Sequence, residues 1–523
     1  MKNKQYDAKN PRHSRLDKLV FYGTVSVTGA AVMMVELLGT RIIGPYYGVS
    51  LIVWSSLLSV SLLALSMGYA VGGRYADKPS GLRLPMAIVL AAISIALVPV
   101  ISETVQVFFN RLGLRWGALS SALVLFTPAL FFLGTAGPFV IRLATRGLEN
   151  VGATAGNVYA ISTVGSVIGT LLLGFYLLPI FGTRAILQAL SFLLLCLSVL
   201  LAFYEQKRFR VKPHILSWSS AVAVFILMFF LQGLTNSQRG GNPQYQVLFE
   251  EETHYGWVRV VDQTDKEIRW LMSDASTIGA EHLPSGKALL GYQSVVRLIP
   301  WFRPQAKNAL LIGLGAGHLV NDYAKFGIKT DAIEIDPAVA KAAVEYFNFK
   351  PTGKVIVGDA RYQVKKLKQR YDFIIHDCFT GGAEPFHLLS QEMLWELKQK
   401  LKPGGILVVN FVGFTDKQRL QPVNSLAKTL DSIFSQRSVF VPRTGQEFSD
   451  YIFVVSNEPL NINKEPDTLQ ARNFLSQRTF DIDSSNGTLI TDDYNPLEFM
   501  QIAKAEYYRE ILVQRVGQSV LFH

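Results

Sequence analysis

The sequence predicts an N-terminal all-α transmembrane bundle of about seven helices, joined to a C-terminal α/β domain that a small antiparallel β subdomain precedes. Three observations lead to this fold class. Only 17% of the 523 residues are charged, against roughly 25% in soluble proteins. The apolar residues are concentrated in 1–234. After about residue 305, apolar runs typical of buried strands alternate with helical segments, which predicts a doubly wound, largely parallel sheet.

Apolar runs in the first half are long enough to cross a bilayer, which takes roughly 20 helical residues. The first run is too long for a signal peptide, and so many runs in one block argue against buried helices of a soluble protein. The seven runs are about 19–40, 50–72, 84–104, 117–141, 158–181, 184–203 and 214–233. We therefore expect a multi-pass protein of the cell membrane, with the lipid bilayer as a partner.

Lysine and arginine cluster in alternate connections between these runs, beginning with the tail at 1–18. Cytoplasmic loops carry such an excess, so the N-terminus is expected to be cytoplasmic. An odd number of spans then places 235–523 outside, whereas the chemistry inferred below belongs in the cytosol, and the side of this half stays open. The net charge of +11 is explained by these loops, and no pattern of basic and aromatic residues indicates nucleic acid.

Small residues recur at a four-residue spacing in two of the runs, as Gly68 with Gly72 and as Gly165 with Gly169. Such spacing lets helix backbones approach closely. We expect contacts inside one chain in preference to a dimer face, although a homodimer stays open. Glu36 lies within the first run, where a carboxylate faces the bundle interior or a cavity, or pairs with Arg41 at the end of the helix.

Composition sets the expected domain boundaries. They are a basic tail at 1–18, the bundle at 19–234, a linker with the small β subdomain at 235–304, and the α/β domain at 305–523. The polar segment 233–244, GLTNSQRGGNPQ, cannot continue a helix. Three segments with period-two patterning, 245–250, 257–262 and 267–272, predict the antiparallel sheet.

The α/β domain is expected to contain five strands and four intervening helices. The strands are 309–312, 329–335, 354–357, 371–376 and 406–411, and the helices are 320–326, 338–347, 361–368 and 390–401. Ligands in such sheets bind beyond the carboxyl ends of the strands. The residues that follow each strand are therefore the candidates for a site.

The first two strand ends carry residues suited to a nucleoside. Gly313, Gly315 and Gly317 follow the first strand, and glycines let the backbone turn sharply near a ligand. Glu334 ends the second strand, where an acid can accept hydrogen bonds from ribose hydroxyls.

The next two strand ends continue this pattern. Asp359 and Ala360 follow the third strand, where a carboxylate beside a backbone amide can read adenine, although Asp359 can equally be a helix N-cap. Asp377 follows the fourth. The loop G-x-G-x-G is not a dinucleotide fingerprint, and the arrangement looks like the S-adenosylmethionine-binding Rossmann-like fold of methyltransferases and aminopropyltransferases. The expected co-substrate is S-adenosylmethionine or its decarboxylated form, and no metal is expected.

Residues 245–415 resemble the spermidine synthase family of polyamine aminopropyltransferases, and more narrowly its membrane-bound members, which fuse such a domain to a hydrophobic bundle. Further segments carry the resemblance: ELLGTR at 36–41, GYAVGGRYAD at 68–77, NVYA at 157–160 and LITDDYNPLE at 489–498. The resemblance implies that Gln246 contacts the nucleoside and that Tyr292 lies close to the reacting amine. It also implies that Gln293, the residue after Tyr292, binds the co-substrate.

For the strand ends the resemblance implies that Glu334 binds ribose, that Asp359 and Ala360 read adenine, and that Asp377 accepts a proton. Ala316 and Thr380 replace two acids that hold amine groups in the family, and Gly381 replaces a proline. The candidates for replacement acids are Glu384, Asp492 and Asp493.

The resemblance therefore implies an enzyme that moves an aminopropyl group from decarboxylated S-adenosylmethionine to a small-molecule amine in polyamine synthesis, releasing methylthioadenosine. A rival interpretation is a methyltransferase or another transferase, because the acid missing at Ala316 would repel the carboxylate of intact S-adenosylmethionine. A third interpretation, motivated by Glu36, is a nucleoside-responsive sensor or transporter.

Overall fold

A computed structural model of the chain describes residues 15–48, 50–78, 83–145, 150–209, 226, 244–274, 276–379, 384–462 and 468–516. The chain divides into two compact units, residues 1–43 with 52–238 and residues 44–51 with 239–523. The described part of the first unit is built of helices, and that of the second contains two sheets with helices around them.

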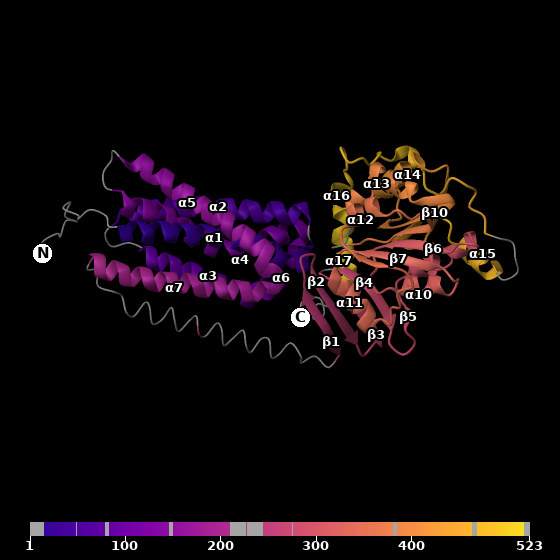
Figure 1. Ribbon diagram of the computed structural model, residues 1–523, viewed down its shortest axis with the longest axis horizontal. Helices are drawn as coiled ribbons and strands as arrows, with labels where there is room; N and C mark the ends of the chain where they lie inside the picture. Colours follow the sequence, from indigo (N-terminus) through magenta and orange to yellow (C-terminus); the bar gives the residue numbers. More distant parts are fainter. Residues whose placement is uncertain are drawn as a thin grey trace. The chain divides into compact units, whose positions relative to one another are not determined.

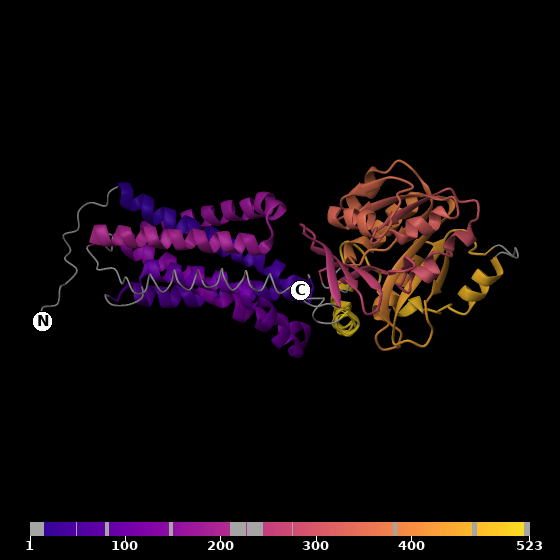
Figure 2. The same ribbon diagram turned by 90° about the horizontal axis from the view of Figure 1, so that it is seen from below.

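Long helices make up the described part of the first unit. They are α1 (Arg15–Tyr47), α2 (Leu51–Ala76), α3 (Leu84–Phe109), α4 (Gly113–Ala144), α5 (Val151–Leu172) and α7 (Thr183–Phe209), with the short α6 (Leu178–Ile180) after α5. They run roughly alongside one another (Figures 1 and 2). These helices coincide with the first six expected runs, and the seventh, 214–233, lies outside the described residues except for residue 226.

Five helical stretches in the described residues are long and apolar enough to cross a membrane. One of them, Leu84–Ala144, contains both α3 and α4. The expected total of about seven spans stays a prediction.

Glycines bring pairs of these helices into close contact. A Cβ added to Gly72 of α2 would lie 2.7 Å from Thr135 Cα of α4, and one added to Gly169 of α5 would lie 2.8 Å from Ala30 Cβ of α1. Side chains do not approach this closely, so the packing requires residues without a Cβ. The predicted small-residue contacts inside one chain are confirmed.

The smaller sheet of the second unit is an antiparallel meander. Its strands follow chain order: β1 (Tyr245–Glu252), β2 (Trp257–Gln263), β3 (Ile268–Ser273), β4 (Ser276–His282) and β5 (Lys287–Ala288). The first three strands confirm the sequence-based expectation. The sequence of β4, STIGAEH, lacks the apolar alternation that marks a half-buried strand, which explains why it was not expected.

The larger sheet has seven strands in the order β11-β12-β10-β9-β6-β7-β8. The five expected strands are present and parallel, and β12 pairs antiparallel with both β10 and β11. The bounds are β6 (Asn308–Ile312), β7 (Lys329–Glu334), β8 (Val355–Val357), β9 (Tyr371–His376), β10 (Leu401–Phe414), β11 (Gln436–Phe440) and β12 (Phe448–Ser456). The carboxyl ends of β6 to β10 therefore meet at one edge.

The four expected helices of this domain are present as α10 to α13. The helices of the second unit are α9 (Gln293–Val296), α10 (His318–Ala324), α11 (Pro337–Tyr346), α12 (Ala360–Lys366), α13 (Gln391–Gln399), α14 (Gln421–Asp431), α15 (Leu469–Ser476), α16 (Leu497–Met500) and α17 (Ile502–Val516). Helix α17 was not expected and forms part of the site described below.

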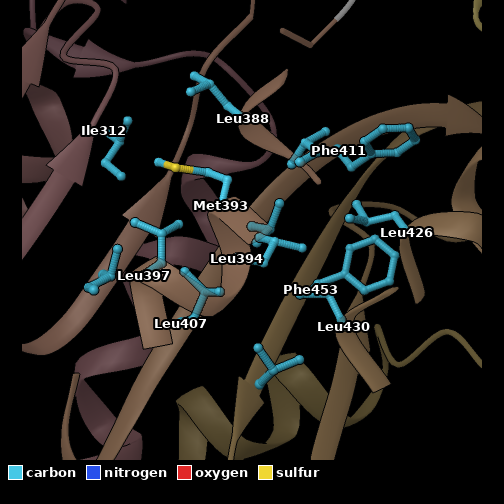
Figure 3. Close-up of a cluster of buried hydrophobic side chains, with 14 of the residues drawn as sticks. Ile312, Leu388, Met393, Leu394, Leu397, Leu407, Phe411, Leu426, Leu430 and Phe453 are labelled. Atoms are coloured by element: carbon cyan, nitrogen blue, oxygen red, sulfur yellow. The ribbon is translucent and has the colours of Figure 1, made fainter. Parts of the chain in front are cut away.

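Apolar side chains pack on both faces of the larger sheet. On one face Leu394 and Leu397 of α13 and Leu430 of α14 belong to one buried cluster with Leu407 and Phe411 of β10 (Figure 3). A second buried cluster, which includes residues of α10, covers the opposite face. Burying each such side chain stabilises the fold by about 1.5–3 kcal/mol, and this packing holds the strand ends in fixed register.

Candidate active site

A cavity of ≈ 710 Å³ lies at the edge where the parallel strands end. Residues that follow β6, β7, β8 and β9 line it, together with residues of β3, β4, β10, β12 and α17. Its volume falls within the roughly 300–1,000 Å³ typical of small-molecule sites. The strand-end residues singled out in the sequence are thus largely brought together.

The glycine loop after β6 approaches the cavity through its backbone. Gly313 and Gly315 line the cavity and have positive φ angles of 90° and 52°. A Cβ at Gly313 would collide with the carbonyl oxygen of Asp377. Gly317, with φ of 76°, is not among the cavity residues and instead lets Phe349 pack against it.

Glu334 ends β7 with a buried carboxylate that lines the cavity. Its two oxygens accept hydrogen bonds from the backbone N–H groups of Leu314, at 2.9 Å, and Asp336, at 3.1 Å. Burial raises the pKa of Glu334, and these hydrogen bonds partly offset the effect. A carboxylate has about four acceptor positions, so Glu334 can also accept hydrogen bonds from ligand hydroxyls.

Asp359 and Ala360 lie where β8 passes into α12, and both line the cavity. Asp359 Oδ1 accepts a hydrogen bond from the backbone N–H of Tyr362 at 2.9 Å, so it is the helix N-cap. The side chain is 45% exposed. The capping role is compatible with ligand contact, because the cap occupies one carboxylate oxygen only.

Asp377, directly after β9, lies at the centre of a hydrogen-bonded group in the cavity. Asn410 Nδ2 of β10 donates to Asp377 Oδ1 at 2.9 Å, and the Tyr292 hydroxyl also bonds to this carboxylate. Burial raises the pKa of Asp377, while the two hydrogen bonds oppose the rise. A carboxylate with a raised pKa is a stronger base than an exposed one, so the position suits proton transfer.

Gln293 supports this group from outside the cavity. Its Nε2 donates to the Tyr292 hydroxyl at 3.2 Å, and the side chain is buried. Gln293 lines a separate polar hollow, not the cavity. The structure therefore places Gln293 behind Tyr292, and its expected contact with the co-substrate stays a prediction.

Gln246 is not brought to the cavity. It lies on β1 opposite Asp262, its side chain is exposed, and it is not among the described residues that line the cavity. β1 is the edge strand of the smaller sheet, whereas β3 and β4 supply the cavity wall. The expected nucleoside contact of Gln246 stays a prediction.

The acids that the resembled family uses to hold amine groups are not replaced in the cavity by the acids that the sequence suggested. Ala316 is buried in an apolar cluster with Val258 and Leu271, and Thr380 and Gly381 lie outside the described residues. Glu384 is bound to Lys504, and Asp492 to Arg361. In the described part of the chain, none of the three candidate replacements (Glu384, Asp492 and Asp493) lines the cavity.

Sequence reasoning missed several polar residues of the cavity, among them Asn410 and Asp450. Asn410 and Asp450 lie on the neighbouring strands β10 and β12. Each interrupts an apolar strand, ILVVNFV and FSDYIFVV, and a polar residue in a buried strand is the signal that could have identified them. Helix α17 was missed as well, and it adds Tyr508 and Arg515 to the wall.

The fold and site define the class of this unit, an α/β domain with a Rossmann-like methyltransferase fold. Residues 290–464 match the family model described as "Spermine/spermidine synthase domain". The second unit thus carries a spermine/spermidine synthase domain, to which an N-terminal helical region is fused.

Curated relatives include both transferase types. An "N-terminal histidine N-methyltransferase" of Emericella nidulans is 30% identical over 234 residues, covering 40% of this chain and 41% of the relative. A "Polyamine aminopropyltransferase" of Vibrio vulnificus is 42% identical over 116 residues, covering 21% and 39%. The chain thus spans about two fifths of the length of each of these two relatives.

A longer alignment includes the helical region. "Polyamine aminopropyltransferase 2" of Aquifex aeolicus is 23% identical over 464 residues, covering 84% of this chain and 86% of the relative. Among solved structures, a "probable spermidine synthase" from Corynebacterium glutamicum superposes with a TM-score of 0.37 at 17% identity, over 50% of this chain and 94% of that chain.

Proposed function

We propose that this protein is a membrane-bound aminopropyltransferase, which moves an aminopropyl group from decarboxylated S-adenosylmethionine to an acceptor amine and releases methylthioadenosine. The single observation that carries the proposal is the hydrogen-bonded group of Tyr292, Asp377 and Asn410 in one cavity with Glu334 and Asp359. The family match at 290–464 includes all of these residues.

The reaction is a direct displacement. The lone pair of the acceptor nitrogen attacks the methylene carbon bonded to the sulfonium, a new N–C bond forms, and the C–S pair returns to sulfur. The nitrogen then carries one proton more than the neutral product, and Asp377 accepts it. Sulfonium is already a good leaving group, so positioning supplies much of the rate, and the displacement needs no metal ion.

The remaining cavity residues have assigned roles in this proposal. Glu334 accepts hydrogen bonds from the ribose hydroxyls, Asp359 and the Ala360 backbone amide bind adenine, and the loop at Gly313 and Gly315 lets the donor approach the sheet edge. Tyr292 orients the acceptor nitrogen toward Asp377. The helical region would hold the domain at a lipid bilayer, which its five long apolar stretches support.

A methyltransferase is the second candidate, and one observation favours it. Ala316 sits in an apolar cluster where the resembled family has an acid, so the loop no longer repels a donor carboxylate. The methyltransferase of Emericella nidulans is also among the relatives. The two candidates differ in donor and in nucleoside product.

Purified full-length protein separates the two candidates. It is incubated with 1,4-diaminobutane and either decarboxylated or intact S-adenosylmethionine, and the nucleoside product is identified by chromatography. We expect methylthioadenosine from the decarboxylated donor. Formation of S-adenosylhomocysteine from the intact donor, without methylthioadenosine from the other, would overturn the aminopropyl assignment.

A further inference from the structure

Asp450 is a second carboxylate in the cavity, and the proposed reaction does not use it. It lies on β12 directly opposite Val412 of β10, and both residues line the cavity. Side chains of directly paired residues share one face of a sheet. Its Oδ2 would lie 3.8 Å from a Cβ added at Gly291, the residue before Tyr292. Asp450 thus faces the same space as Asp377.

Charged and titratable groups approach Asp450 from several elements. They are Tyr292 before α9, Asp377 after β9, Glu384 before α13, and Lys504, Tyr508 and Arg515 of α17. Lys504 is already paired with Glu384. Burial and the nearby carboxylate of Asp377 raise the pKa of Asp450 to about 7, and Arg515 opposes this rise. Arg515 therefore only partly offsets the charge of the Asp450 carboxylate.

Asn410 adds an acceptor atom near Asp377 and Asp450. Asn410 is buried, with 8% of its surface exposed, and lines the cavity. Its amide nitrogen is used by Asp377, while its Oδ1 accepts no hydrogen bond from any residue in the described part of the chain. An ammonium group has three donors and no acceptor. Two carboxylates and a free amide oxygen match that chemistry.

We infer that Asp450 binds a charged ammonium group of the acceptor and so determines which amines the enzyme accepts. This inference rests on the proposed function and names a residue for it. Asp377 takes the proton of the reacting nitrogen, and Asp450 holds a second nitrogen of the same molecule. The acids absent at Ala316 and Thr380 are thereby replaced by one on an antiparallel strand.

The test compares Asp450→Asn with Asp481→Asn, an exposed aspartate outside the cavity. Methylthioadenosine release is measured with 1,4-diaminobutane and with 1-aminobutane as acceptors. We expect Asp450→Asn to raise KM for the diamine at least tenfold, with kcat within about threefold and methylthioadenosine binding unchanged. The preference for the diamine over the monoamine should fall by a similar factor, which a merely structural role would not cause. Asp481→Asn should match the wild type.

An unchanged diamine preference in Asp450→Asn would overturn the inference. If the wild type released no methylthioadenosine with any amine, the proposed function would fail separately. Asp450 would then be judged by calorimetric titration of 1,4-diaminobutane into protein saturated with methylthioadenosine. Binding at least tenfold weaker in Asp450→Asn supports the inference, and equal binding, or no binding to the wild type, overturns it.

Discussion

Asp377 gains its chemistry from its surroundings. The strand β9 delivers the carboxylate to the cavity, burial raises its pKa, and the hydrogen bonds from Tyr292 and Asn410 fix its orientation. A base whose pKa lies closer to the working pH accepts a proton more effectively. The same surroundings predict that loss of the charge affects turnover more than nucleoside binding.

Asp377→Asn is expected to lower kcat by about 10²–10⁴-fold, the usual contribution of a general base. The amide keeps the shape of the side chain, so the Kd for methylthioadenosine should change less than threefold. Steady-state turnover and calorimetry measure the two quantities. Full activity in this variant would refute Asp377 as the proton acceptor, and Asp481→Asn serves as the control.

The raised pKa of Asp450 predicts that the free energy of unfolding depends on pH. Its pKa of about 7 lies above the value of about 3.9 for an unfolded aspartate. Between these values the folded state binds more protons than the unfolded state, so stability falls as the pH rises. Burial is the main cause of the raised pKa, Asp377 and Glu384 add to it, and Arg515 opposes it.

Asp450→Asn should therefore stabilise the protein at pH 8, by on the order of 2–4 kcal/mol, and much less at pH 5. Thermal unfolding of both proteins at the two pH values gives the comparison. If Asp450→Asn shifted the melting temperature equally at pH 5 and pH 8, ionisation of Asp450 would not destabilise the folded protein, and this prediction would be wrong.

Sequence reasoning located most of this site because four of its acids and glycines follow parallel strands. Topology alone brings Gly313, Glu334, Asp359 and Asp377 to one edge. Asp450 could not be placed in this way, since it lies within an antiparallel strand and reaches the cavity through its register with Val412. Gln246 was expected from a motif match alone, which carries no information on which strand lines the cavity, and its nucleoside contact stays a prediction.

At the scale of elements, α17 is held to the domain by a buried ion pair. Lys504 of α17 and Glu384 are each 3% exposed, and Glu384 also accepts hydrogen bonds from the Val412 backbone N–H, at 2.7 Å, and from Gln501 Nε2, at 3.1 Å. Glu384 precedes α13 on the segment that follows Asp377. The pair thereby connects the segment after β9 to α17, which forms part of the cavity wall.

Lys504→Ala should destabilise the second unit by about 3–5 kcal/mol, because it leaves the carboxylate of Glu384 buried without its partner. The double variant Glu384→Gln with Lys504→Met removes both charges and should be closer to the wild type. Lys341→Ala breaks an exposed pair with Glu251 and should cost less than about 1 kcal/mol. Chemical denaturation of the full chain is the measurement, and equal effects of Lys504→Ala and Lys341→Ala would contradict this account.

The elements themselves were predictable to different degrees. The parallel strands β6 and β9 are almost entirely buried and largely apolar, so a local sequence pattern identifies them. The strands β4 and β5 are short or polar, and β11 and β12 follow the expected α/β pattern without a helix between them. Their positions depend on pairing partners far along the chain, which a local pattern does not contain.

At the scale of the whole molecule, the basic residues and the proposed donor together constrain how many times the chain crosses the bilayer. The basic tail at 1–18 favours a cytoplasmic N-terminus, and the proposed donor is a cytosolic metabolite. Both conditions hold together only if the chain crosses the bilayer an even number of times. The long helices α1, α2, α3, α4, α5 and α7 provide six candidates, whereas a crossing by 214–233 would carry the second unit outside.

Cysteine labelling in intact cells decides between these topologies. Asp265→Cys places a thiol in the exposed turn between β2 and β3, and Arg111→Cys places one in the α3–α4 connection, which the charge rule assigns to the outside. Cys196→Ser removes one native thiol, and burial raises the pKa of Cys378, which slows its labelling.

We expect a membrane-impermeant maleimide to label Arg111→Cys in intact cells and Asp265→Cys only after permeabilisation. This result would place the synthase domain beside its cytosolic donor, with six crossings before it. Labelling of Asp265→Cys in intact cells, at the rate of Arg111→Cys, would place the domain outside. A cytosolic donor could not then reach Asp377 without transport, and the proposed aminopropyl transfer would lose its substrate.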